Sequence, residues 1–123
     1  MQAARALGWL IAASAAVRVV SYGRLTRAIA RIPRGRSSMT PAECATAIRR
    51  AAQIWPAACL PQAIAGYCLL QRAGLAPAIE LGVARDGHGL DAHAWLECDG
   101  VIVTGGDMER AYAPLPAPER PSP

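Results

Sequence analysis

The chain of 123 residues is long enough for one domain with a modest hydrophobic core. Its net charge is +4, but residues 1–36 hold seven arginines and no acidic residue, whereas residues 37–123 hold six arginines and nine acidic residues. Any anionic partner is therefore expected to meet the N-terminal segment. Nucleic acid is not expected as a partner, because the sequence shows neither zinc-finger spacing nor a basic face interleaved with aromatic residues.

The four cysteines are spaced by 15, 9 and 30 residues and form no CxxC pair. This spacing is typical of neither a zinc framework nor a dense disulfide scaffold. Because no cleavable signal is evident, the reducing cytoplasm is the expected location. The four are Cys44, Cys59, Cys68 and Cys98.

The N-terminal residues 1–31 are rich in alanine and dotted with arginine. The apolar run from residue 6 to 16 is shorter than the roughly 20 residues that a membrane span needs, although it also resembles the core of a signal peptide. The arginines beyond it recur at helical spacing. We therefore expect one or two amphipathic helices that either cover the domain or make peripheral membrane contact.

A change of composition at residues 32–38 indicates a linker. The expected organisation is a basic amphipathic helical segment with its linker over residues 1–36 and a catalytic domain over residues 37–113. Residues 114–123 contain five of the ten prolines and are expected to be a disordered tail.

A first helix of the domain is predicted over Pro41 to Ile54. Thr40 is a good N-cap, Pro41 suits the first helical position, and Glu43 completes a capping box. The dipeptide Trp55-Pro56 ends this helix. Cys44 is expected on its buried face.

A second helix is predicted to begin with a cysteine. Pro61 lacks a backbone N–H and therefore fits only the first turn of a helix, which places the start near residues 58–60 and Cys59 at the N-terminal end. The free N–H groups and the positive end of the helix dipole favour an anion there, either the thiolate of Cys59 or an oxyanion. The alternative is that Cys59 is a small buried hydrophobe. The apolar positions that follow are Leu60, Ile64, Tyr67 and Leu70.

After Gly74 the pattern changes to the period of β-strands, with strands predicted over residues 78–83, 91–98 and 101–104. Asp99-Gly100 is a strong hairpin signal. Residues 85–89 are expected to form a loop that leaves His88 in solvent. Helices followed by an antiparallel sheet predict an α+β fold.

Alternation along the second strand places His93, Trp95 and Glu97 on one face. The opposite face is apolar and is expected to be the core face. A helix that docks its N-terminal Cys59 on the His93 face would bring thiol and imidazole together, the minimal pair for acyl transfer. The apolar face consists of Ala92, Ala94, Leu96 and Cys98.

Several segments in this order resemble the transglutaminase-like cysteine proteases of lasso-peptide biosynthesis. The resemblance covers residues 40–115 and implies a papain-like/transglutaminase-like core, in which a nucleophile helix packs on a small antiparallel sheet after N-terminal helices. The chain resembles the split form, whose leader-recognition domain is a separate protein. The segments are Cys59-Leu60-Pro61, Leu69 to Leu75, Leu81-Gly82-Val83, Ala92 to Glu97, and Asp99-Gly100.

The resemblance implies that Cys59 is the nucleophile and that His93 is the general base and acid. It also implies an aspartate about twelve residues after the histidine, where this sequence has Gly105. Asp107 is the candidate third residue, but strict alternation directs it to the wrong face unless a β-bulge forms at residues 105–106. The alternatives for orienting His93 are a backbone carbonyl, Asp91 and Glu97.

Two further residues complete the expected site. Gln53 precedes Cys59 at the spacing of the oxyanion-hole glutamine in papain-like enzymes, although it could also be a surface glutamine late in its helix. The backbone N–H of Cys59 is the other oxyanion donor. Trp95 is expected to form one wall of the site, whereas Cys68 and Cys98 are expected in the core.

The implied activity is removal of the leader from a lasso-peptide precursor by a cysteine endopeptidase without cofactor or metal. The implied partners are the precursor peptide, a separate leader-recognition protein and an ATP-dependent, asparagine-synthetase-like cyclase. A transglutaminase-like thiol acyltransferase and a non-catalytic, membrane-associated adaptor are the alternatives.

Overall fold

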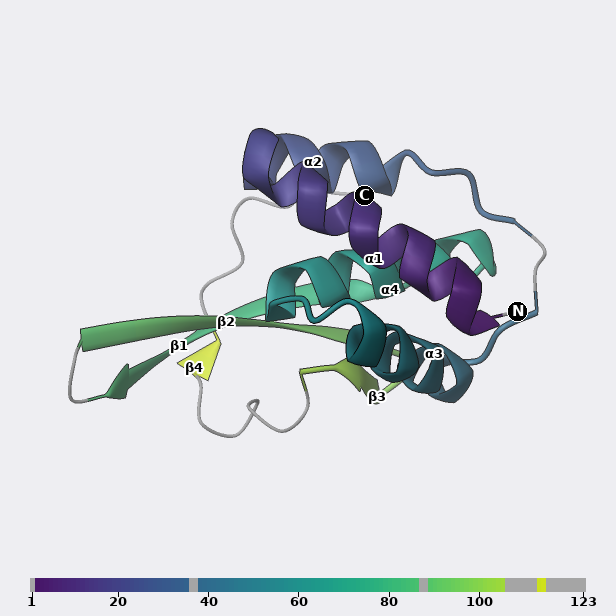
Figure 1. Ribbon diagram of the computed structural model, residues 1–123. Coiled ribbons are helices and arrows are strands. Elements are labelled where there is room, and N and C mark those ends of the chain that lie inside the picture. The colour runs from purple at the N-terminus through teal and green to yellow at the C-terminus, as the bar shows by residue number, and fades with distance from the viewer. Residues whose placement is uncertain (1, 36–37, 87–88, 106–112, 115–123) are drawn as a thin grey trace.

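The computed structural model describes residues 2–35, 38–86, 89–105 and 113–114, which form four helices and a four-stranded antiparallel sheet of order β3-β2-β1-β4. Figure 1 shows the helices gathered on one side of this sheet. The expected α+β class, with helices packed on a small antiparallel sheet, is confirmed. The helices are α1 (Gln2–Val19), α2 (Tyr22–Ala30), α3 (Pro41–Ile54) and α4 (Cys59–Arg72), and the strands are β1 (Ala78–Asp86), β2 (Gly89–Cys98), β3 (Val101–Thr104) and β4 (Ala113–Pro114).

Helix α3 starts and stops as its sequence predicts. The Thr40 hydroxyl accepts a hydrogen bond from the backbone N–H of Glu43 at 3.1 Å, and the Glu43 carboxylate accepts one from the N–H of Thr40 at 2.9 Å. These bonds to Thr40 lower the pKa of Glu43, because they stabilise its ionised form. The capping box is therefore confirmed, and the helix ends before Trp55.

The strands form two consecutive hairpins. Asp99 and Gly100 have φ values of 52° and 79°, as expected for the tight turn that joins β2 to β3. The prediction of a loop over residues 85–89 was wrong at its ends, because the β1–β2 ladder continues to the pairs Arg85–Leu90 and Asp86–Gly89. His88 lies outside the described residues, as does the tail beyond residue 114.

Both N-terminal helices contribute to the same hydrophobic core as the rest of the domain. Helix α1 packs against α3 and α4, where Ala6 and Leu10 are fully buried, and α2 adds Leu25 and Ile29. Of the two roles expected for this segment, the structure shows the helices covering the domain. Among the described residues, no helix is long and apolar enough to cross a membrane.

The contact of α4 with β2 depends on a glycine. A Cβ built on Gly66 would lie only 2.6 Å from Cδ2 of Leu96, so the missing side chain lets the helix approach the strand closely. Ala63 and Cys59 precede Gly66 at helical spacing and share its side of the helix. Helix α4 thus packs on the face of Leu96, and the prediction that it docks on the His93 face was wrong.

Replacing Gly66 with alanine is expected to destabilise the fold by about 1–3 kcal/mol, because the fully buried Leu96 has little room to move. The control is Gly8→Ala in α1, where a Cβ meets nothing within 4 Å and where alanine should stabilise the helix by about 0.5–1 kcal/mol. Urea denaturation of the two variants measures both effects. Equal stability of the two would contradict the packing argument.

Candidate active site

Cys59 is the first residue of α4, as its sequence predicts. The N-cap residue Ala58 is extended, with φ −68° and ψ 173°, and has no side-chain cap. In its place, the side-chain amide of Gln62 donates to the carbonyl of Ala57 at 2.7 Å, and the N–H of Gln62 donates to the carbonyl of Ala58 at 3.3 Å. Gln62 therefore holds the segment that leads into Cys59, a role that sequence reasoning missed. Its only signal is a glutamine at the fourth helical position.

The thiol of Cys59 reaches the residue beside His93. Its sulfur accepts a hydrogen bond from the backbone N–H of Ala94 at 3.4 Å. Strand β3 ends at Thr104, opposite Leu96, so Ala94 lies beyond the last pair of the β2–β3 ladder. Because backbone N–H groups of a strand lie in the plane of the sheet, the sulfur sits at the level of the sheet. Cys59 is only half-buried there.

The imidazole of His93 is held by a backbone carbonyl. Nε2 of His93 lies 3.2 Å from the carbonyl oxygen of Gly105. A carbonyl can only accept, so Nε2 carries the proton and Nδ1 is the basic nitrogen of the neutral ring. The ring of Trp95 stacks beside it, with centroids 6.3 Å apart and an angle of 27° between the planes. Trp95 is itself buried.

Gly105 adopts a backbone conformation that favours glycine and leaves no room for a side chain. Its φ is +77°, and a Cβ at this position would lie 2.9 Å from Nε2 of His93 and 2.8 Å from the carbonyl oxygen of Ala94. The backbone at Gly105 therefore approaches His93 more closely than any side-chain-bearing residue could. This is the position at which the family resemblance implies an aspartate.

A β-bulge interrupts the ladder between β2 and β3. The register changes from Glu97–Ile102 to Leu96–Thr104, which makes Val103 the extra residue, whereas residue 106 of the bulge considered from the sequence lies outside the described residues. Of the candidates for orienting His93, Glu97 pairs with Ala78 and Ile102 in the sheet. Asp107 and the side chain of Asp91 lie outside the described residues.

The other three cysteines are in the core, as expected. Burial raises the pKa of Cys44 to about 12 and that of Cys68 to about 12, and burial is also the main cause of the raised pKa of Cys98. All four thiols are free. The protein therefore has three thiols that stay protonated near neutral pH, beside the more accessible thiol of Cys59.

The remaining candidate from the sequence is Gln53. Gln53 is exposed near the end of α3, and no hydrogen bond joins it to Cys59 in the described part of the chain.

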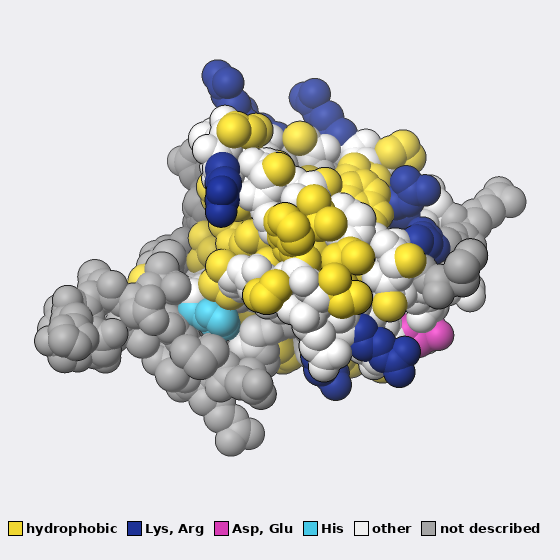
Figure 2. All heavy atoms as spheres, in the orientation of Figure 1, with side chains coloured by type: hydrophobic (Ala, Val, Ile, Leu, Met, Phe, Trp, Pro, Cys, Tyr) yellow, Lys and Arg dark blue, Asp and Glu magenta, His cyan; other side chains and the backbone are white. Residues whose placement is uncertain are grey.

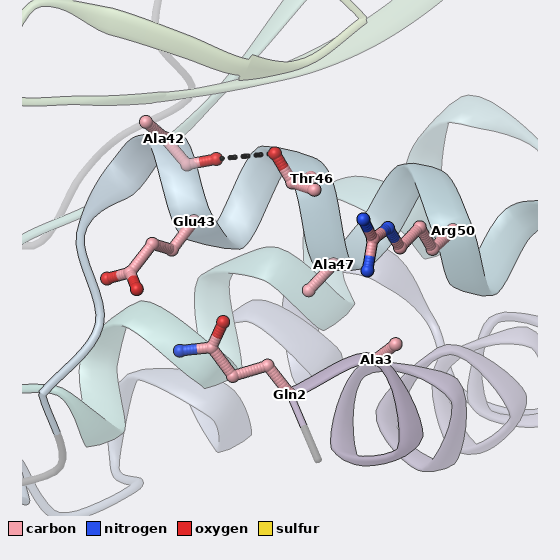
Figure 3. Close-up of a pocket in the computed structure, with 7 residues that line it drawn as sticks. All are labelled: Gln2, Ala3, Ala42, Glu43, Thr46, Ala47 and Arg50. Atoms are coloured by element: carbon pink, nitrogen blue, oxygen red, sulfur yellow. Dashed lines mark hydrogen bonds between the residues drawn. The ribbon is translucent and has the colours of Figure 1, made fainter.

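Two hollows lie elsewhere on the surface. The first, of about 260 Å³, lies between α1 and α3 and is lined by Gln2, Glu43 and Arg50 among others (Figure 3). A second, of about 380 Å³, is lined by Arg5, Gly8, Trp9 and Arg72. Neither includes Cys59 or His93.

Selective alkylation tests the difference between the thiols. At pH 8, iodoacetamide is expected to modify Cys59 first, because thiols with a raised pKa remain protonated and unreactive until pH approaches that raised value. Peptide mass mapping after brief treatment identifies the labelled site. Equal labelling of Cys44 and Cys59 in the folded protein would contradict the burial of Cys44, whereas labelling of all four after unfolding is the control.

Comparison with known proteins bears on the same residues. A profile of the transglutaminase-like superfamily matches residues 3–117 and so includes the N-terminal helices, Cys59 and His93. Neither curated protein sequences nor solved structures gave a significant match. The chain belongs to the transglutaminase-like superfamily, which includes cysteine proteases and acyltransferases.

Proposed function

We propose that the protein is a cysteine endopeptidase that removes the leader from a lasso-peptide precursor. The observation that carries the thiol chemistry is the meeting of Cys59, at the start of α4, with the backbone beside His93. Membership of the transglutaminase-like superfamily supports the same chemistry. The leader-peptidase role rests on the resemblance of the sequence segments around Cys59 and His93.

In the proposed reaction, the sulfur of Cys59 attacks the carbonyl carbon of the scissile peptide bond after Nδ1 of His93 has taken its proton. The N–H groups of Cys59 and Leu60 have no acceptor within the helix and would hold the oxyanion. His93 then returns the proton to the departing amine as the C–N bond breaks. Water hydrolyses the resulting thioester, which frees the acid product and restores the thiol. Gln53 remains a predicted further oxyanion donor.

The orientation of His93 is proposed to come from the Gly105 carbonyl, with Asp107 as an additional predicted partner. Acceptance of the Nε2–H by this carbonyl fixes the tautomer in which Nδ1 is basic. The proposal for Asp107 rests on the sequence, in which it is the nearest acidic residue after the position where the family resemblance implies an aspartate.

The proposed partners follow from the leader-peptidase role. They are the precursor peptide, a separate leader-recognition protein that delivers it, and an ATP-dependent, asparagine-synthetase-like cyclase that closes the ring on the new N-terminus. We place the reaction in the cytoplasm, and we keep peripheral membrane contact through residues 1–31 as an alternative that vesicle flotation tests. Product mass distinguishes hydrolysis, which yields the free core peptide, from transfer by an acyltransferase, which yields an adduct.

Substitution of the pair tests the chemistry. Cys59→Ala and His93→Ala are each expected to lower precursor cleavage by at least about 10³-fold while leaving the fold intact, because neither retains the thiol–imidazole pair. Cleavage is followed by mass spectrometry and the fold by circular dichroism. The matched control is Cys68→Ala, the same change in the same helix, which should keep turnover. Full cleavage by Cys59→Ala would reject the protease and favour the adaptor.

A second pair of variants tests how His93 is held. Gly105→Ala should lower kcat by about 10²-fold with little change in KM, since a misplacement of about 1 Å has effects of this size. Gly100→Ala is the control, because its φ of +79° imposes a similar strain while a Cβ there meets nothing within 4 Å. The two should lose similar stability, but only Gly105→Ala should lose turnover.

Asp107→Ala completes this comparison. We expect a milder loss of kcat than for Gly105→Ala, because the carbonyl still holds Nε2. A loss as large as that of His93→Ala would instead make the carboxylate the main orienting group. Turnover equal to that of the unmodified protein would remove Asp107 from the site.

A further inference from the structure

Large apolar side chains are exposed on the face of the molecule that carries α1 and the segment before α4. The exposed fractions are 40% for Ile11, 71% for Ile54 and 43% for Trp55. Figure 2 shows hydrophobic side chains gathered on this face, with a histidine at their edge. A patch of this kind near Cys59 is a candidate binding surface, because large contiguous exposed apolar patches often mark binding sites.

A hydrogen bond joins the two parts of this patch. The indole N–H of Trp55 donates a hydrogen bond to the hydroxyl of Ser14 at 3.2 Å. This bond connects the residue that follows α3 to α1. Ile11 lies three residues before Ser14 and four before Ala15, so the three are neighbours along one side of the helix. We define the α1–Trp55 surface by its five contributing residues. They are Ile11, Ala15, Ile54, Trp55 and Pro56.

The rim of the α1–Trp55 surface is cationic at Arg18, which is exposed one turn after Ser14. Arg50 is exposed one turn before Ile54, but it lines the same hollow as Glu43. The described residues 2–35, which include Arg18, contain no acidic side chain. Dark blue arginines surround the hydrophobic centre of this face in Figure 2.

The surface leads directly to the nucleophile. Pro56 is exposed three residues before Cys59, and Ala58 between them is exposed as well. A polypeptide bound with its scissile bond at Cys59 would therefore continue onto the surface. A bilayer suits the geometry less well, because it would cover the half-buried thiol and because few large apolar side chains are available to enter it.

We propose that the α1–Trp55 surface binds a segment of the peptide substrate that combines apolar side chains with carboxylates. The apolar side chains would cover Trp55 and Ile54, and the carboxylates would pair with Arg18. This inference rests on the proposed function, because it takes Cys59 as the place where the bond is cut. It adds a substrate class, an acidic and apolar peptide, to that function.

Binding is measured without catalysis, on the full-length Cys59→Ala protein. The probes are a short fluorescein-labelled peptide that alternates leucine with glutamate and the same peptide with glutamine in place of glutamate. Fluorescence anisotropy should show tighter binding of the glutamate peptide, with an advantage that shrinks as salt is added. Ile54→Ser and Arg18→Glu, each introduced into the Cys59→Ala protein, should weaken binding of the glutamate peptide about fivefold. The controls are Val101→Ser and Arg24→Glu, which make the same kinds of change elsewhere and should bind normally.

Four results would overturn the proposal. Equal affinity for the two peptides would show that binding does not depend on the carboxylates. An equal loss of affinity in the control variants would show that the peptide does not bind specifically at the α1–Trp55 surface. Flotation with phosphatidylglycerol vesicles that is lost in Arg18→Glu, without peptide binding, would assign the surface to a membrane. A dimer that Ile54→Ser dissociates, seen by light scattering without peptide binding, would assign it to a second copy. Since binding is measured without the thiol, inactivity of the unmodified protein would count against the proposed function alone.

Discussion

The close approach of α4 to β2 determines where the thiol lies. Gly66 faces Leu96 without a side chain between them, and the small Ala63 continues the same side of the helix toward its start. A helix is stiff over two turns, so the contact at Gly66 also fixes the height of Cys59 above the strand. The result is the contact between the Cys59 sulfur and the N–H of Ala94. A larger residue at position 66 would thus act on the thiol from a distance, through the tilt or shift of the whole helix.

The imidazole depends on a different constraint, the place where β3 stops pairing with β2. Because the ladder ends at Leu96–Thr104, the part of β2 that carries His93 and Ala94 is not covered by β3. The sulfur of Cys59 takes the N–H of Ala94, and the chain turns at Gly105 to offer its carbonyl to His93. One interrupted ladder therefore provides both a position for the thiol and an acceptor for the imidazole. The α1–Trp55 surface adjoins the same end of α4, so the proposed substrate contacts and the proposed chemistry share one helix start.

Much of this arrangement could be predicted because it is encoded locally. Pro61 fixed the start of the Cys59 helix, the capping box fixed the start of α3, and Asp99-Gly100 fixed the hairpin, each through a backbone preference of a few adjacent residues. Alternation did identify the face of Ala94, Leu96 and Cys98 as the core face, and α4 packs on it. It did not show that a helix on that face still brings Cys59 to the backbone beside His93, because the N–H of Ala94 lies in the plane of the sheet. The bulge at Val103 depends on how β3 packs against β2 and the helices, and the residues of Val101–Thr104 include no glycine or other sequence signal that predicts it. The role of Gln62 depends on a contact with the loop before Cys59, which spacing does not reveal.

The carbonyl of Gly105 has a consequence for how such a site can change over time. Every amino acid carries a backbone carbonyl, so no point mutation deletes this acceptor in the way that it deletes a carboxylate. What a lineage must preserve at this position is a torsion angle, and only the residues that tolerate φ +77° preserve it. A relative that lacks an acidic residue at this position would then not have to be inactive. A glycine at the position would instead indicate that the backbone carbonyl orients the histidine.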